Sequence, residues 1–205
     1  MSGGGIALGE ALQVLRAARG QGDVVISAMG AAREWMAGGP PHPLDWVFVP
    51  SSMGQATALG LGLALARPDR RIIVLNGDGG MLMNLGSLVT ISACGPENLV
   101  VLLFDNGVYE ITGAQPTPSA PGARVRGDPV DFLALARSAG ILSTFRFGTV
   151  AEWRAEVPAV LRARGPTVAV LDTAPVPHAR GPRSPGPAPE RARRFMAALD
   201  AAGDA

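Results

Sequence analysis

The sequence predicts an α/β protein with a doubly wound, mostly parallel sheet and helices on both faces. Helical and strand patterns alternate along almost the whole chain. The strand segments are apolar on both faces, as parallel strands are when helices cover both sides of the sheet. Two of these strands run directly into polar turns. Ligands of such sheets bind at the carboxyl ends of the strands, so these turns are where we expect a site.

The helices and strands of the first half are predicted from the spacing of hydrophobic residues and from the positions of Gly and Pro. Residues 9–19 place Leu12 and Leu15 at helical spacing, which predicts an amphipathic helix. The short run at 23–30 is rich in β-branched residues and ends at Gly30, which predicts a buried strand. Further expected elements are a helix over 31–37, a strand over 45–50, a helix over 54–66 and a strand from 70 into the Gly-rich turn at 77–80.

The second half continues the alternation. We expect a helix over 81–95, a strand over 98–107, a long Gly/Pro loop over 109–128, a helix over 128–141, a strand over 143–149, a helix over 150–164 and a strand over 165–175. Asp128 is the expected cap of the helix at 128–141, and Pro129 fits its first turn. The predicted organisation is a domain over 1–174, followed over 175–205 by a Pro-rich linker and a short C-terminal helix.

Composition excludes several classes of protein. Of 205 residues, 47% are hydrophobic and 17% charged, which favours a globular chain with a large core over a disordered one. The net charge of +1 gives no electrostatic case for binding nucleic acid or an anionic membrane. Cys94 is the single cysteine, which excludes an internal disulfide or a four-thiolate cluster and favours the cytoplasm. We find no signal peptide pattern and no apolar run of spanning length.

The turns after two neighbouring strands carry the chemistry. Asp78 lies between Gly77 and Gly79 just before a helix, whose N-terminus attracts phosphate. A carboxylate there repels phosphate unless a cation lies between them, and Mg²⁺ suits oxygen ligands of this kind. The side chain of Asn106 and the carbonyl of Val108 supply two more oxygens from the second turn. Together the turns predict a site for Mg²⁺ and a diphosphate.

Other interpretations of the first turn are weaker. A lone Gly-Asp-Gly is common at strand-to-helix turns, where it serves backbone conformation and capping. The dinucleotide-binding pattern fails because Leu82 stands where its last glycine is needed. A Walker-type loop fails because no Lys-Ser/Thr pair follows.

The two turns and their flanks resemble a known family. Gly-Asp-Gly, followed after a helix and a strand by Asp-Asn, resembles the signature of thiamine-diphosphate-dependent enzymes. More narrowly, "VPSSMGQATALGLGLALARPDRRIIVLNGDGGMLMNLGSL" and "NLVVLLFDNGVYEITGAQPT" are similar to the sulfopyruvate and phosphonopyruvate decarboxylases. The resemblance covers residues 24–117 well, and "PERARRFMAAL" resembles the terminal helix of that family.

The resemblance implies roles for individual residues. Asp78 and Asn106 would bind Mg²⁺ through their side chains, and Val108 through its carbonyl. Met53 would hold the cofactor in a bent shape that brings its aminopyrimidine to the reactive thiazolium carbon. The implied cofactor-binding residues are Ser51, Ser52, Met53, Gly54, Gly77, Asp78, Gly79, Gly80, Asn106, Val108 and Tyr109.

The resemblance also implies a partner. Enzymes of this family need a glutamate beside the pyrimidine ring, on a second domain, and this chain looks like the diphosphate domain alone. The chain's glutamates at 10, 34, 97, 152 and 156 look like ordinary helix or loop charges. A pyrimidine-binding subunit would supply the glutamate, and the Gly and Ala residues at 54, 58, 62 and 66 suit a close subunit interface. The implied enzyme decarboxylates a 2-oxoacid. The alternatives are a carboligase subunit and a non-catalytic, cofactor-binding regulatory subunit.

The loop after Asn106 departs from these relatives. They have a small residue after the tyrosine and two glycines before "QPT", whereas this chain has Glu110 after Tyr109 and Ala114 in place of the second glycine. We expect Glu110 to be a solvated loop charge. The other interpretation is that it faces the substrate, where its charge would disfavour a sulfonate or phosphonate.

Overall fold

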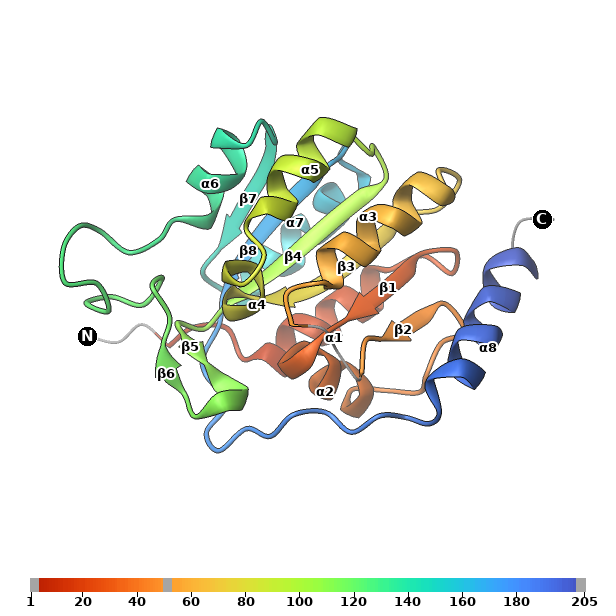
Figure 1. Ribbon diagram of the computed structural model, residues 1–205, viewed down its shortest axis with the longest axis horizontal. Coiled ribbons are helices and arrows are strands. Elements are labelled where there is room, and N and C mark those ends of the chain that lie inside the picture. The colour runs from red at the N-terminus through yellow and green to blue at the C-terminus, as the bar shows by residue number, and fades with distance from the viewer. Residues whose placement is uncertain (1–3, 50–52, 202–205) are drawn as a thin grey trace.

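Six parallel strands form the central sheet in the computed structural model, which describes residues 4–49 and 53–201 (Figure 1). Their spatial order is β2-β1-β3-β4-β8-β7, and every neighbouring pair is parallel. The strands are β1 (Val24–Ser27), β2 (Asp45–Val47), β3 (Ile72–Gly77), β4 (Leu99–Asp105), β7 (Ser143–Phe147) and β8 (Thr167–Asp172). The prediction of a doubly wound parallel sheet is confirmed.

Helices cover both faces of this sheet. They are α1 (Leu8–Ala18), α2 (Met29–Ala37), α3 (Ala56–Ala66), α4 (Asp78–Leu82), α5 (Gly86–Cys94), α6 (Phe132–Ser138), α7 (Val150–Arg162) and α8 (Ala188–Ala201). Buried side chains of α3, α4, α5, α6 and α8 join one core cluster, and those of α1, α2 and α7 join another. No helix within 4–49 or 53–201 is long and apolar enough to cross a membrane.

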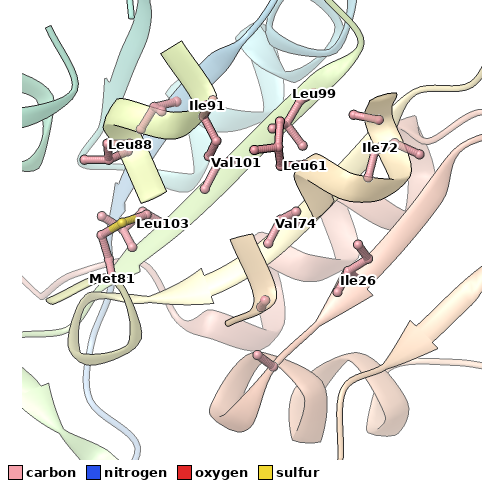
Figure 2. Packing of buried hydrophobic residues seen from close by; sticks show 14 of the residues in the cluster. Ile26, Leu61, Ile72, Val74, Met81, Leu88, Ile91, Leu99, Val101 and Leu103 are labelled. Carbon is pink, nitrogen blue, oxygen red and sulfur yellow. The ribbon is translucent and has the colours of Figure 1, made fainter. Parts of the chain in front are cut away.

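Successive side chains of each strand point to opposite faces of the sheet, and the side chains on both faces are apolar. On β3, Ile72 and Val74 point into one cluster, while Ile73 and Leu75 point into the other. Figure 2 shows the first cluster, in which Leu61 of α3 lies near the strand residues. Burying both faces of a strand leaves no room for polar side chains within it. The polar residues therefore collect at the strand ends.

Two predicted helices have different boundaries in the structure. The helix expected at 81–95 is two helices, α4 and α5, and α4 already begins at Asp78. The helix expected from Asp128 begins at Phe132 instead, and the prediction of Asp128 as its cap is wrong. The carboxylate of Asp131 accepts the N–H groups of Leu133 and Ala134 and thereby caps α6.

The long loop after β4 has structure of its own. β5 (Val108–Tyr109) pairs antiparallel with β6 (Gln115–Pro116), and the 3₁₀ turn η1 (Glu110–Thr112) lies between them. Ala114 has a φ of +57°, a left-handed conformation that favours glycine. A glycine would adopt this conformation with less strain.

The C-terminal helix packs on the edge strand of the domain. The rings of Phe195 and Trp46 have centroids 5.4 Å apart, and Phe195 is buried in the core. Arg191 donates hydrogen bonds to the carbonyls of Val47 and Val49, so it satisfies the otherwise free edge of β2. Between β8 and α8 the segment 174–187 runs along the domain (Figure 1).

Candidate functional site

A cleft opens at the carboxyl ends of β1 and β3, which are neighbours in the sheet although β2 lies between them in sequence. From β1 the chain continues to β2 on one side, whereas β3 lies on the other side, so this is a topological switch point. The cleft holds about 770 Å³ of empty space, counted to its open mouth. Segments following β1, β2, β3 and β4 all contribute to its walls.

The structure brings the described candidate residues together. Nine of the eleven line this one cleft: Met53, Gly54, Gly77, Asp78, Gly79, Gly80, Asn106, Val108 and Tyr109. The other two, Ser51 and Ser52, lie outside the described residues. Residues that are up to 56 positions apart in sequence thus share one wall because parallel strands end at the same edge of the sheet.

Asp78 is a buried acidic group that lines the cleft. It is the first residue of α4 and only 2% exposed. Its Oδ2 accepts a hydrogen bond of 2.8 Å from the hydroxyl of Thr117, which is fully buried, and a longer one of 3.4 Å from Ser119. The Ser119 hydroxyl also lies 2.8 Å from Asp105, and because it has a single hydrogen it donates mainly across this shorter distance.

Burial makes ionisation of Asp78 costly. Desolvation raises its pKa to about 6, against the hydrogen bond from Thr117, which lowers it, and the nearby Asp105 raises it further. Burial also raises the pKa of Asp105. A cation bound at this turn would offset both effects. Among the described residues no group of three or more His, Cys, Asp and Glu side chains could hold a metal ion, so a cation here would need neutral oxygens as well.

Neutral oxygens come from the turn after the neighbouring strand β4. The Oδ1 atom of Asn106 accepts the N–H of Val108 at 3.0 Å, and the Nδ2 atom donates to Glu110 at 3.3 Å. Both Asn106 and Val108 line the cleft. One carboxylate, one amide oxygen and one carbonyl fit Mg²⁺, which uses few protein oxygens and keeps water or phosphate oxygens in its other positions.

The positions of the three glycines in the first turn, Gly77, Gly79 and Gly80, differ in the space that a side chain would have. A Cβ on Gly79 would lie 2.6 Å from the ring of Tyr109, and one on Gly80 would lie 2.4 Å from Oδ1 of Asn76, so both positions are too close-packed for a side chain. Gly77 differs, because a Cβ there would meet only the carbonyl of Phe104 at 4.0 Å. At Gly77 the backbone faces open space, as a phosphate-binding turn requires.

Sequence reasoning missed three polar residues at this site, Asn76, Thr117 and Ser119, and expected the wrong surroundings for a fourth, Glu110. Thr117 and Ser119 hold Asp78, while Asn76 lines the cleft with a buried Nδ2 that has no hydrogen-bond partner. Glu110 was expected to be a solvated charge, and this is wrong: its side chain is 7% exposed. Its carboxylate accepts hydrogen bonds from Arg33 at 3.3 Å and from the N–H of Val176 at 2.7 Å. The "QPT" stretch quoted for the resemblance contains Thr117, which was the available signal.

A family model matches most of the chain. Residues 23–171 match the model described as "Thiamine pyrophosphate enzyme, C-terminal TPP binding domain". The chain belongs to this family. The match extends from just before β1 to the last but one residue of β8, so it includes every residue that lines the cleft except Leu8.

Individual relatives point the same way. The chain is 46% identical over 93 residues to sulfopyruvate decarboxylase subunit beta of Methanothermobacter thermautotrophicus, which is 45% of this chain and 45% of that protein. It is 37% identical over 148 residues to phosphonopyruvate decarboxylase of Streptomyces hygroscopicus, or 72% of this chain and 35% of that protein. The matched segments thus span less than half of these relatives.

A solved structure shares the fold. The thiamine diphosphate-dependent 4-hydroxybenzoylformate decarboxylase of Rhodococcus jostii RHA1 superposes with a TM-score of 0.69 at 20% identity. The superposition covers 85% of this chain and 34% of that one. At this identity the likeness shows the fold alone.

Proposed function

We propose that this chain is the diphosphate- and Mg²⁺-binding subunit of a two-chain, thiamine-diphosphate-dependent 2-oxoacid decarboxylase. The family match supports the cofactor. The observation that carries the proposal is the convergence of Asp78, Asn106 and Val108 on one cleft at the switch point of the sheet. These three residues would hold Mg²⁺, and the open turn at Gly77 would receive the diphosphate.

The residues of this chain fit that cofactor electrostatically. A diphosphate carries negative charge that only a cation can bring beside the carboxylate of Asp78. The buried hydroxyl of Thr117 keeps one carboxylate oxygen in place, and the unpaired Nδ2 of Asn76 is a donor that the protein itself leaves unsatisfied. When bound, thiamine diphosphate supplies the nucleophilic carbon that attacks the 2-oxoacid and stabilises the carbanion left after loss of CO₂.

A pyrimidine-binding subunit would complete the site. Within the described residues Glu110 is the glutamate that lines the cleft, and its carboxylate is already held by Arg33 and the backbone of Val176. It is not free to serve the pyrimidine ring. A partner's glutamate therefore remains part of the proposal. The ion pair with Arg33 also offsets the charge of Glu110, which removes an objection to an anionic 2-oxoacid.

The apolar outer face of α3 and α5 supports the proposal of a partner subunit. Neither helix carries a charged residue, and a helix that is apolar all round is normally covered. Here Leu65 is 53% exposed and Val89 60% exposed, with Ala58, Gly62 and Ala66 also on the surface. Met53 and Met83 are exposed and line the cleft, so this apolar face continues to the mouth of the site. A partner covering the face would reach the cofactor.

Reconstitution tests the proposal. The chain is mixed with a pyrimidine-binding subunit, thiamine diphosphate and Mg²⁺, and a panel of 2-oxoacids is assayed for CO₂ and for the aldehyde. We expect both products in equal amounts with at least one acid and none with the chain alone. CO₂ without free aldehyde indicates the carboligase alternative, and no turnover of any acid contradicts both. The Asp78→Ala variant should lose Mg²⁺-dependent cofactor binding, and unchanged binding would rule out the metal site.

A further inference from the structure

The amide of Asn106 has two distinct ends, and only one orientation gives a cation an oxygen. In the structure Oδ1 accepts the N–H of Val108 at 3.0 Å, which places this oxygen on the same side as the Val108 backbone. The Nδ2 end donates to Oε1 of Glu110 at 3.3 Å. If the amide rotated by half a turn, its NH₂ would face the N–H of Val108 and its oxygen would face a carboxylate, and both contacts are repulsive.

Glu110 is itself held from three sides. Its Oε1 accepts the N–H of Val176 at 2.7 Å, and its Oε2 lies 3.3 Å from Nη2 of Arg33 on α2. Arg33 in turn donates to the carbonyl of Arg180 at 3.0 Å and to Glu34 at 2.9 Å. A buried carboxylate with this many donors has one defined position. The contacts join the turn after β4, helix α2 and the segment after β8.

The space around Glu110 also restricts where its carboxylate can lie. A Cβ on Gly30 would lie 2.9 Å from Oε2 of Glu110, so the carboxylate occupies the space above this glycine. Both residues line the cleft. A larger residue at position 30 would therefore push the carboxylate away from Asn106 without changing residue 110.

We infer that Glu110 is a positioning residue, which accepts the amide hydrogens of Asn106 and thereby keeps Oδ1 turned toward the cation. The inference rests on the proposed function only for the identity of that cation. Hydrogen-bond partners of metal ligands typically change metal affinity by about 10–100-fold when removed. Position 110 would thus tune cofactor binding through Asn106, while the same carboxylate also accepts the N–H of Val176.

The first test needs no cofactor. In the 205-residue chain, NMR follows the two Nδ2 hydrogens of Asn106 and the backbone amide of Val176. We expect slow exchange for both in the wild type, and fast exchange in Glu110→Ala. Gly30→Ala should speed exchange at Asn106, and Glu110→Gln should preserve it because Gln retains an accepting oxygen. The exposed Glu156→Ala on α7 is the matched control and should match the wild type. An Asn106 signal unchanged in Glu110→Ala overturns the inference, and so does a Gln variant that fails as completely as Ala.

In the second test, thiamine diphosphate is titrated into the chain mixed with its pyrimidine-binding partner, with Mg²⁺ present, and binding is measured by calorimetry. Glu110→Ala should bind about tenfold more weakly, while Glu110→Gln should stay within about threefold of the wild type, since the accepting oxygen is kept. Thermal unfolding shows whether each variant folds. If Glu110→Ala does not fold, the affinity of Glu110→Gln tests the inference instead. Equal affinity of the wild type and Glu110→Ala overturns the inference but leaves the proposed function standing. A wild type that binds no cofactor with its partner contradicts the proposed function, while the NMR result still decides the inference.

Discussion

The hydroxyl of Thr117 donates a 2.8 Å hydrogen bond to Oδ2 of Asp78, although 39 positions separate the two residues. Thr117 is fully buried, and Asp78 is 2% exposed. The bond therefore joins the loop after β6 to the first turn of α4 away from water. In such surroundings a hydrogen bond to a charged group stabilises by about 1.5–3 kcal/mol.

Replacing this hydroxyl should destabilise the chain in a pH-dependent way. Thr117→Val keeps the shape but removes the shorter of the two hydroxyl hydrogen bonds to the Asp78 carboxylate, so we expect the free energy of unfolding to fall by about 1–3 kcal/mol at pH 7.5. The loss should be smaller at pH 5, where the carboxyl group is largely protonated. Urea unfolding at the two pH values measures this. Thr90→Val is the control, because the hydroxyl of Thr90 bonds the carbonyl of Gly86 at an exposed position. Equal losses for both variants would contradict the prediction.

Neutralising Asp78 should stabilise the chain without cofactor. Burial raises the pKa of Asp78 from 3.8 to about 6, so the folded state binds a proton more tightly than the unfolded state. Stability therefore falls as pH rises from about 4 to about 6 and then levels off. Since one pKa unit corresponds to about 1.4 kcal/mol, Asp78→Asn should gain on the order of 3 kcal/mol at pH 7.5 and less below pH 4.

The same substitution should have the opposite effect on ligand binding. Asp78→Asn removes the negative ligand, so Mg²⁺ with thiamine diphosphate should no longer raise the melting temperature of the chain. Thermal unfolding with and without both additives measures this. An Asn variant that is less stable than the wild type at pH 7.5 without additives would contradict the burial argument.

A glycine at position 114 should stabilise the hairpin. Ala114 has a φ of +57°, a conformation that costs about 1 kcal/mol in alanine and much less in glycine. We expect Ala114→Gly to raise the free energy of unfolding by about 0.5–1 kcal/mol, since the greater freedom of glycine in the unfolded chain offsets part of the gain. Ala120 lies in the same loop but does not have a positive φ, so Ala120→Gly is the control and should be neutral or destabilising. A destabilising Ala114→Gly would contradict the prediction.

A charge on the apolar face of α3 should block the partner and spare the fold. Ala58 is exposed on α3, so Ala58→Glu should change the melting temperature of the isolated chain little. In a complex it would bury an unpaired carboxylate, and binding to a pyrimidine-binding subunit should weaken at least about tenfold. Ala155→Glu on α7, on the other side of the sheet, is the matched control. Equal binding by the two variants would place the partner elsewhere.

Local sequence patterns predicted most of the helices and strands. The strand segments Ile72–Gly77 and Leu99–Asp105 are visible in the sequence because burial on both faces permits only apolar residues within them. Boundaries at capped ends were less certain. Asp128 and Asp131 both precede the same helix, and only the backbone path decides that Asp131 reaches the free N–H groups. The break between α4 and α5 is likewise invisible, because both segments are apolar.

By itself the sequence determined the strands, the two polar turns and, through its resemblance, the family and its cofactor. Asp78 and Asn106 could be found because each directly follows a recognisable strand. The tertiary structure decided the adjacency of β1 and β3, and the contacts of Thr117 with Asp78 and of Glu110 with Asn106, Arg33 and Val176. Local patterns report whether a side chain is buried or turned, whereas a hydrogen bond between distant segments depends on how the whole chain closes around the sheet.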